Sequence, residues 1–179
     1  MSNSASIYVA TLENYFWIQV NGKGNVFISP TLKDFTDSLF KNCDNSGELP
    51  QLTDTPSAIV LDLKNCCSMD STFMGMIAGL AIKINNTPKS LFYLCNVEKK
   101  NRSSLEELGL DCIVDINNPS IPWTTLEEKV ANKLQIWDSD KASSPNSQLI
   151  FETHSTLGSL STTNKEKFAD VIKISKDEL

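Results

Sequence analysis

Residues 58–84 read AIVLDLKNCCSMDSTFMGMIAGLAIKI and carry the clearest structural signal in the chain. The apolar run at 58–63 lacks the alternation of a half-exposed strand, which predicts a strand covered on both faces. Residues 64–69 interrupt this pattern and predict a loop. Residues 71–84 are apolar over a length typical of a buried helix. The stretch therefore predicts a strand, a loop and a helix in succession.

Ser71 falls at the start of that helix. Asp70 before it is a favoured N-cap residue, because its carboxylate can accept hydrogen bonds from N–H groups of the first turn. Those N–H groups lack partners within the helix and, with the helix dipole, favour negative charge. A phosphate on the Ser71 hydroxyl is therefore tolerated there. In isolation the Asp-Ser pair favours a plain helix cap without a signalling role.

The segments Ile59–Leu63 and Met69–Gly75 together resemble the core of a STAS domain, the domain of bacterial anti-sigma factor antagonists. The resemblance covers roughly residues 7–117. It aligns Asp62 with the acid at the end of the family's strand, and Ser71 with its phosphorylatable serine. The loop acid, the adjacent hydroxyl and the helix glycine of the family correspond to Asp70, Thr72 and Gly75.

This resemblance implies a regulatory protein that is not an enzyme. Unphosphorylated, it would bind a serine-kinase anti-sigma factor and free a sigma factor. The kinase would phosphorylate Ser71, with Thr72 as a weaker alternative acceptor, and a PP2C-type phosphatase would reset it. Phe73 departs from the small residue that is frequent in the family, and we expect its ring at the edge of the partner-facing surface. The expected partner-binding residues are Asp62, Asp70, Ser71, Thr72, Phe73, Met74 and Gly75.

The family resemblance implies no catalytic residue, cofactor or metal. For Asp62, a purely structural role is the alternative to partner contact. The neighbouring pair Cys66-Cys67 lies close to Ser71 in sequence, but no histidine accompanies it as a metal ligand would.

Strands alternate with helices in the rest of the chain. Apolar and alternating residues predict strands over residues 7–12, 15–20, 91–95 and 112–116. The glycine-bearing segment 21–25 predicts a plain turn.

Capping signals predict three further helices. Ser29-Pro30 predicts the start of the first. Ser103 or Ser104, each followed three residues later by Glu, predicts the start of the second. Thr124-Thr125 predicts the cap of the third, whose apolar stripe reaches Trp137. Because crossover connections between parallel strands are right-handed, we expect an α/β fold, a STAS-like mixed sheet with helices packed mainly on one face.

We expect residues 1–137 to form this domain, residues 138–147 a linker, and residues 148–179 a C-terminal helical hairpin extension. The linker is rich in Ser, Asp, Lys and Pro. The extension carries apolar residues at helical spacing, which must be buried against the domain, a partner protein or a second copy of the chain. A homodimer through the C-terminal helices is therefore one of three open alternatives.

The composition excludes several classes of function. A net charge of −6 and a pI of about 4.8 argue against nucleic-acid binding, which needs a basic face. No apolar stretch reaches the roughly 20 residues of a membrane span. The polar first residues lack the pattern of a signal peptide, and five cysteines without C-x-x-C spacing predict free thiols and a cytoplasmic protein. Two of them, Cys95 and Cys112, lie in strand-like runs and are expected in the core.

Two other functions remain open. A scaffold or interaction module in a signalling assembly would use the same core and the C-terminal helices without phosphorylation. A small hydrolase would need a nucleophile and a base, but the chain lacks a G-x-S-x-G turn. His154, the only histidine, has the spacing of a residue on a helix face.

Overall fold

The computed structural model describes residues 5–41, 57–137 and 144–179. Residues 42–56, which include Cys43, and most of the predicted linker lie outside the described residues.

The described residues form one mixed sheet with the strand order β6-β5-β3-β2-β1-β7. The strands β2, β3, β5 and β6 run parallel, whereas β1 is antiparallel to both β2 and β7. A further short strand, β4, pairs in parallel with the far end of β2. The bounds are β1 Ser6–Leu12, β2 Tyr15–Gly24, β3 Ser57–Asp62, β4 Cys66–Met69, β5 Ser90–Cys95, β6 Asp115–Ile116 and β7 Gln135–Ile136. The expected mixed sheet is thus confirmed.

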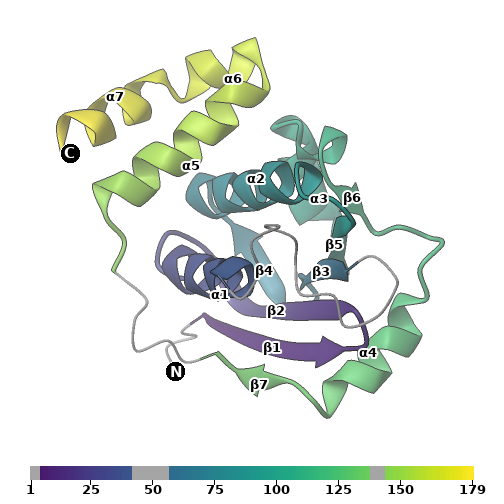
Figure 1. Ribbon diagram of the computed structural model, residues 1–179. Coiled ribbons are helices and arrows are strands. Elements are labelled where there is room, and N and C mark those ends of the chain that lie inside the picture. The colour runs from purple at the N-terminus through teal and green to yellow at the C-terminus, as the bar shows by residue number, and fades with distance from the viewer. Residues whose placement is uncertain (1–4, 42–56, 138–143) are drawn as a thin grey trace.

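Helices α1 and α2 pack on one face of the sheet, α4 lies against the other, and α5, α6 and α7 form a further layer beyond α2 (Figure 1). The bounds are α1 Ser29–Lys41, α2 Ser71–Asn85, α3 Lys99–Glu107, α4 Trp123–Ala131, α5 Ser147–Leu160, α6 Thr162–Lys167 and α7 Ala169–Asp177. A 3₁₀ turn, η1, covers Leu110–Cys112. We refer to residues 147–177 as the C-terminal helices.

The central strand β3 divides the core because its side chains alternate between the two faces. Leu61 belongs to the larger cluster, which includes Phe73 and Ile77 of α2. Val60 belongs to a smaller cluster with Val130 of α4. All six residues of β3 are buried, which confirms the predicted strand with both faces covered.

The C-terminal helices contribute to the larger cluster rather than standing apart from it. Leu157 of α5 and Phe168, which follows α6, are both buried there. The Asn164 side chain of α6 donates to the Leu108 carbonyl at 2.9 Å, and Lys167 lies 2.6 Å from a carboxylate oxygen of Glu107. These contacts join α6 to the region around the end of α3.

Two predicted loops contain strand residues. Residues 21–24 continue β2 instead of forming a plain turn, and residues 66–69 form β4 beside them. Gly24 permits this because a Cβ there would lie 2.6 Å from the Phe73 ring. Glycine is therefore needed here to leave room for a side chain of α2. In the sequence alone, the same glycine indicates a turn.

Three local predictions were also wrong. Helix α3 starts at Lys99, and Ser103 donates to the Lys99 carbonyl from within the helix instead of capping it. Helix α4 has Pro122 as its N-cap and ends at Ala131, because the next residues pair with β1 as β7. Cys112 is exposed in η1, since the strand predicted over residues 112–116 is reduced to Asp115–Ile116.

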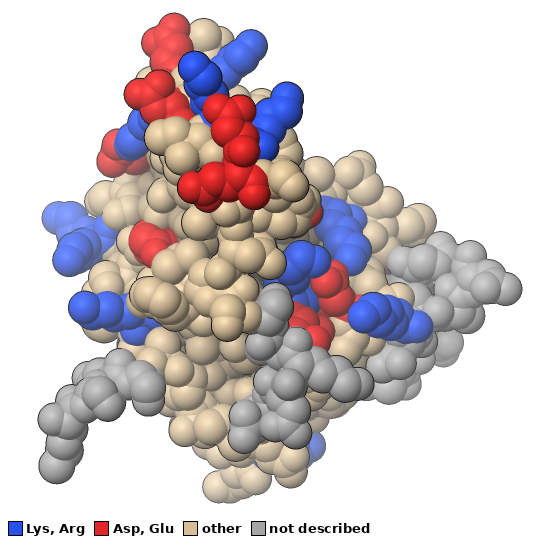
Figure 2. Space-filling model, turned by 90° about the vertical axis from the view of Figure 1, so that its left-hand side faces the viewer, with Lys and Arg blue, Asp and Glu red and all other residues tan. Residues whose placement is uncertain are grey.

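Acidic and basic side chains are intermixed over the C-terminal helices at the top of Figure 2. This arrangement creates no patch of a single sign on that surface (Figure 2). None of the helices in the described ranges has both the length and the apolar character that a membrane span requires.

Candidate functional site

The start of α2 is fixed by the side chain of Asp70. One carboxylate oxygen accepts a hydrogen bond from the Phe73 N–H at 2.9 Å, which confirms the predicted N-cap. The other oxygen accepts from the Val26 N–H at 2.8 Å, and the Asp70 N–H donates to the Gly24 carbonyl. Asp70 thereby joins the turn after β2 to the first turn of α2 and gives Ser71 a defined position.

Ser71 is the first residue of α2 and is partly exposed. Its Oγ lies 2.9 Å from Nε2 of His154, which α5 supplies from 83 positions further along the chain. The other ring nitrogen, Nδ1, lies 2.8 Å from the Ile150 carbonyl oxygen. Because a carbonyl only accepts, Nδ1 carries a hydrogen, and Nε2 of the neutral ring accepts the Ser71 hydroxyl proton. The phosphate acceptor predicted from sequence is therefore engaged by α5.

His154 is held firmly in this position. Its side chain is among the buried polar groups, with 5% exposure, and its ring meets Phe168 edge to face with the ring centroids 5.3 Å apart. The histidine thus links α5 to the Ser71 end of α2 and, through Phe168, to the junction of α6 and α7.

A hydroxyl bonded to an oriented imidazole is also the arrangement of an activated serine nucleophile. Acyl transfer further needs donors for a developing oxyanion. Here the Phe73 N–H is already occupied by the Asp70 carboxylate, whose charge opposes an oxyanion beside it. The arrangement therefore favours positioning of the hydroxyl over hydrolytic chemistry.

Helix α5 approaches the backbone of α2 closely at Gly75. A Cβ on Gly75 would lie 2.5 Å from the Thr153 carbonyl oxygen and 2.7 Å from Thr153 Cβ. Glycine is therefore required here by packing against the C-terminal helices. From the sequence, Gly75 is expected at the partner surface; in the structure it packs against Thr153 of α5.

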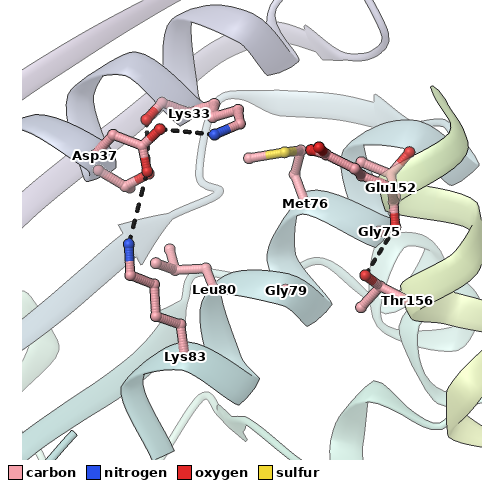
Figure 3. Close-up of a pocket in the computed structure, with 11 residues that line it drawn as sticks. Lys33, Asp37, Gly75, Met76, Gly79, Leu80, Lys83, Glu152 and Thr156 are labelled. Carbon is pink, nitrogen blue, oxygen red and sulfur yellow. Dashed lines mark hydrogen bonds and ion pairs between the residues drawn. The ribbon is translucent and has the colours of Figure 1, made fainter. Parts of the chain in front are cut away.

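A cavity of about 230 Å³ lies beside this contact, between α1, α2 and α5. Figure 3 shows Asp37 of α1 between the ammonium groups of Lys33 and Lys83, at 2.7 and 3.7 Å. Glu152 and Thr156 border the cavity from α5. Neither Ser71 nor His154 lines it, so the Ser71–His154 pair does not face this space.

Five of the seven residues expected at the partner surface are buried in the structure: Asp62, Thr72, Phe73, Met74 and Gly75. The expectation for Phe73 was wrong. Its ring is fully buried against Gly24 in the larger core cluster, so its bulk fills the space that the glycine leaves.

Asp62 is separated from the other six predicted residues by the sheet. It follows Val60 by two positions and so faces the α4 side, whereas α2 lies on the opposite side. Its carboxylate is 1% exposed and accepts four hydrogen bonds, from Trp17, Gln19, Lys64 and Asn96. A buried carboxylate with this many donors is satisfied by its own fold.

The two neighbouring cysteines near Ser71, Cys66 and Cys67, differ in exposure. Cys66 is buried, and burial raises the pKa of its thiol, while Cys67 is exposed. Within the described residues, no group of three or more His, Cys, Asp or Glu side chains is placed to hold a metal ion.

Sequence reasoning missed the role of His154. It identified the residue as a histidine on a helix face, and the nearest signal was its position between the apolar residues Phe151 and Leu157. Nothing in that spacing indicates which serine the ring will meet, because the contact depends on how α5 crosses α2.

Comparison with solved structures identifies a neighbour in fold. The chain is similar to a Thermotoga maritima protein described as a "putative anti-sigma factor antagonist", with a TM-score of 0.51 and 21% sequence identity. The match covers 67% of this chain and 91% of the neighbour. No protein-family model matches the chain, and no curated protein matches it. The structural likeness confirms the predicted fold; identity this low carries no activity with it.

Proposed function

We propose that this protein is a regulatory binding protein of the anti-sigma factor antagonist type, switched by phosphorylation at Ser71. It binds a serine-kinase anti-sigma factor and frees a sigma factor. The kinase ends the binding by phosphorylating Ser71, and a PP2C-type phosphatase restores it. The observation that supports this most directly is a partly exposed serine at the first position of α2, in a fold shared with the Thermotoga protein.

The surroundings of Ser71 suit a charge switch. A phosphate adds roughly −1.5 to −2 units of charge and three acceptor oxygens. The Asp70 carboxylate beside it already accepts from two backbone N–H groups, so the new charge meets a like charge. A partner surface built for a neutral hydroxyl would be repelled without any change of fold.

Phe27 supplies an apolar anchor near this position. Its ring is 74% exposed, and it follows Val26, whose N–H is bound by Asp70. Exposed aromatic rings are frequent energetic anchors of protein interfaces. We therefore assign Phe27 to the partner surface. Phe27→Ala should weaken binding, while Ile136→Ala, a similarly exposed apolar residue on β7, should leave binding unchanged.

Mass spectrometry after incubation with ATP and a purified serine-kinase anti-sigma factor from the same cell tests the switch. We expect phosphate on Ser71 rather than on the buried Thr72. Ser71→Ala should bind at least as tightly as the wild type, because it also loses the bond to His154, and Ser71→Asp should bind more weakly. Equal binding by both variants, or phosphate elsewhere, would contradict the mechanism.

A scaffold module without phosphorylation is the second candidate, and the contact between Ser71 and His154 favours it. In that case the hydroxyl serves to hold α5 in place, and partners use other surfaces. Ile174 is exposed on α7 and could take part in pairing of two chains through the C-terminal helices. Sedimentation of Ile174→Glu against the wild type tests the homodimer, since a buried charge would dissociate it.

A further inference from the structure

Helix α5 occupies the face of α2 on which the proposed function depends. The backbone of Thr153 approaches Gly75 so closely that a single Cβ has no room between them. One turn earlier on α2, the Ser71 hydroxyl is bonded to His154. A partner protein that contacts Gly75 or bonds the Ser71 hydroxyl must displace these contacts, although Ser71 itself is partly exposed.

Phosphoryl transfer to Ser71 also requires that the hydroxyl be released from His154. The kinase must bring the γ-phosphate of ATP into line with the Ser71 Oγ and remove the hydroxyl proton, forming the phosphoester and releasing ADP. The Ser71 Oγ lies 2.9 Å from Nε2 of His154, and in the tautomer whose Nδ1–H donates to the Ile150 carbonyl this nitrogen accepts the hydroxyl proton. The buried imidazole therefore stands where an approaching nucleotide or base would have to be.

We propose that the C-terminal helices are an autoinhibitory element: α5 competes with the partner for the Ser71 end of α2. This inference rests on the proposed function, because it assumes that the partner binds there. The docked form is closed to the anti-sigma factor and to phosphorylation. The partner binds only those molecules in which α5 has left α2. The apparent affinity for the partner is therefore lowered by the fraction of molecules that are in this undocked form.

Some contacts that dock the C-terminal helices lie away from Ser71, so docking can be weakened without changing Ser71 itself. Asn164 donates to the carbonyls of Leu108 and Leu157 at 2.9 and 3.1 Å. Leu157 is fully buried in the larger core cluster. Substitutions at Asn164 and Leu157 therefore loosen the C-terminal helices without altering Ser71, Asp70 or Phe27.

The test uses the full chain with Leu157→Ala or Asn164→Ala, and Ile174→Ala as the matched control. Ile174 lies in the same helices but is 61% exposed, so its loss should not affect docking. Hydrogen exchange should show faster exchange in α5 and unchanged protection in β3 for the first two variants. Should Leu157→Ala fail to fold, Asn164→Ala, which removes two hydrogen bonds but no apolar side chain, provides the same test.

Binding to the purified serine-kinase anti-sigma factor is then measured by calorimetry, and Ser71 phosphorylation by mass spectrometry. We expect the loosened variants to bind about tenfold or more tightly than the wild type, and to be phosphorylated correspondingly faster. Equal affinity and rate would overturn the autoinhibition but leave the proposed function standing. Failure of every variant to bind or to be phosphorylated would overturn both.

Discussion

Gly75 and Gly79 lie one turn apart on α2, and replacing each by alanine should change stability in opposite directions. Alanine is favoured over glycine inside a helix by about 0.5–1 kcal/mol. At Gly79 a Cβ meets nothing within 4 Å, so the full gain is expected. At Gly75 the Cβ would lie 2.5 Å from the Thr153 carbonyl oxygen, an atom that moves only if α5 moves.

Overpacking of this kind costs about 1–3 kcal/mol, with the upper half expected where backbone is the obstacle. After subtraction of the helix gain, Gly75→Ala should lower the free energy of unfolding by about 1–2.5 kcal/mol. For a chain of this size each kcal/mol changes Tm by about 2–4 °C. Gly79→Ala should therefore raise Tm by a few degrees, and Gly75→Ala should lower it.

Urea and thermal unfolding followed by circular dichroism measure both variants under the same conditions. Hydrogen exchange in Gly75→Ala should rise mainly in α5. The reasoning is refuted if Gly75→Ala matches or exceeds the wild type in stability, because α5 would then not be packed on α2 at this distance.

Asp70→Ala should lower the free energy of unfolding by about 1–2 kcal/mol in urea titrations, because the variant loses the cap of α2. Asp70→Asn should retain part of that stability, since the amide oxygen can still accept the Phe73 N–H while the bond from the Val26 N–H is lost; an equal loss in both variants would show that the cap bond to Phe73 contributes little. Cys67 is exposed and should be alkylated by iodoacetamide within minutes in the native protein. Cys95 should react only after unfolding, because burial strongly raises the pKa of its thiol, and rapid native labelling at Cys95 would contradict its place in the core.

The sequence predicts those features of this molecule that depend on neighbours along the chain. The buried β3 follows from an apolar run, and the start of α2 follows from Asp70, whose partner lies three residues away. Phe73 packs against Gly24, about fifty positions away in the chain. Because this contact is not local, the sequence predicts a turn at Gly24 and an exposed ring at Phe73.

The candidate site divides in the same way. Ser71 could be located at the helix start from sequence alone, because a cap is a local device. Its bond to His154 could not, since it requires α5 to cross α2 at Gly75, and no local pattern encodes a crossing between two helices.

The two outermost strands of the sheet, β6 and β7, are each only two residues long. Within the described residues, each of these two strands therefore offers few open backbone groups to a foreign strand, which disfavours strand addition to them. Recognition of helix surfaces and turns is favoured over strand addition at these two positions. Specificity then depends on side-chain shape and charge, which mutation can retune one residue at a time while the backbone scaffold stays constant.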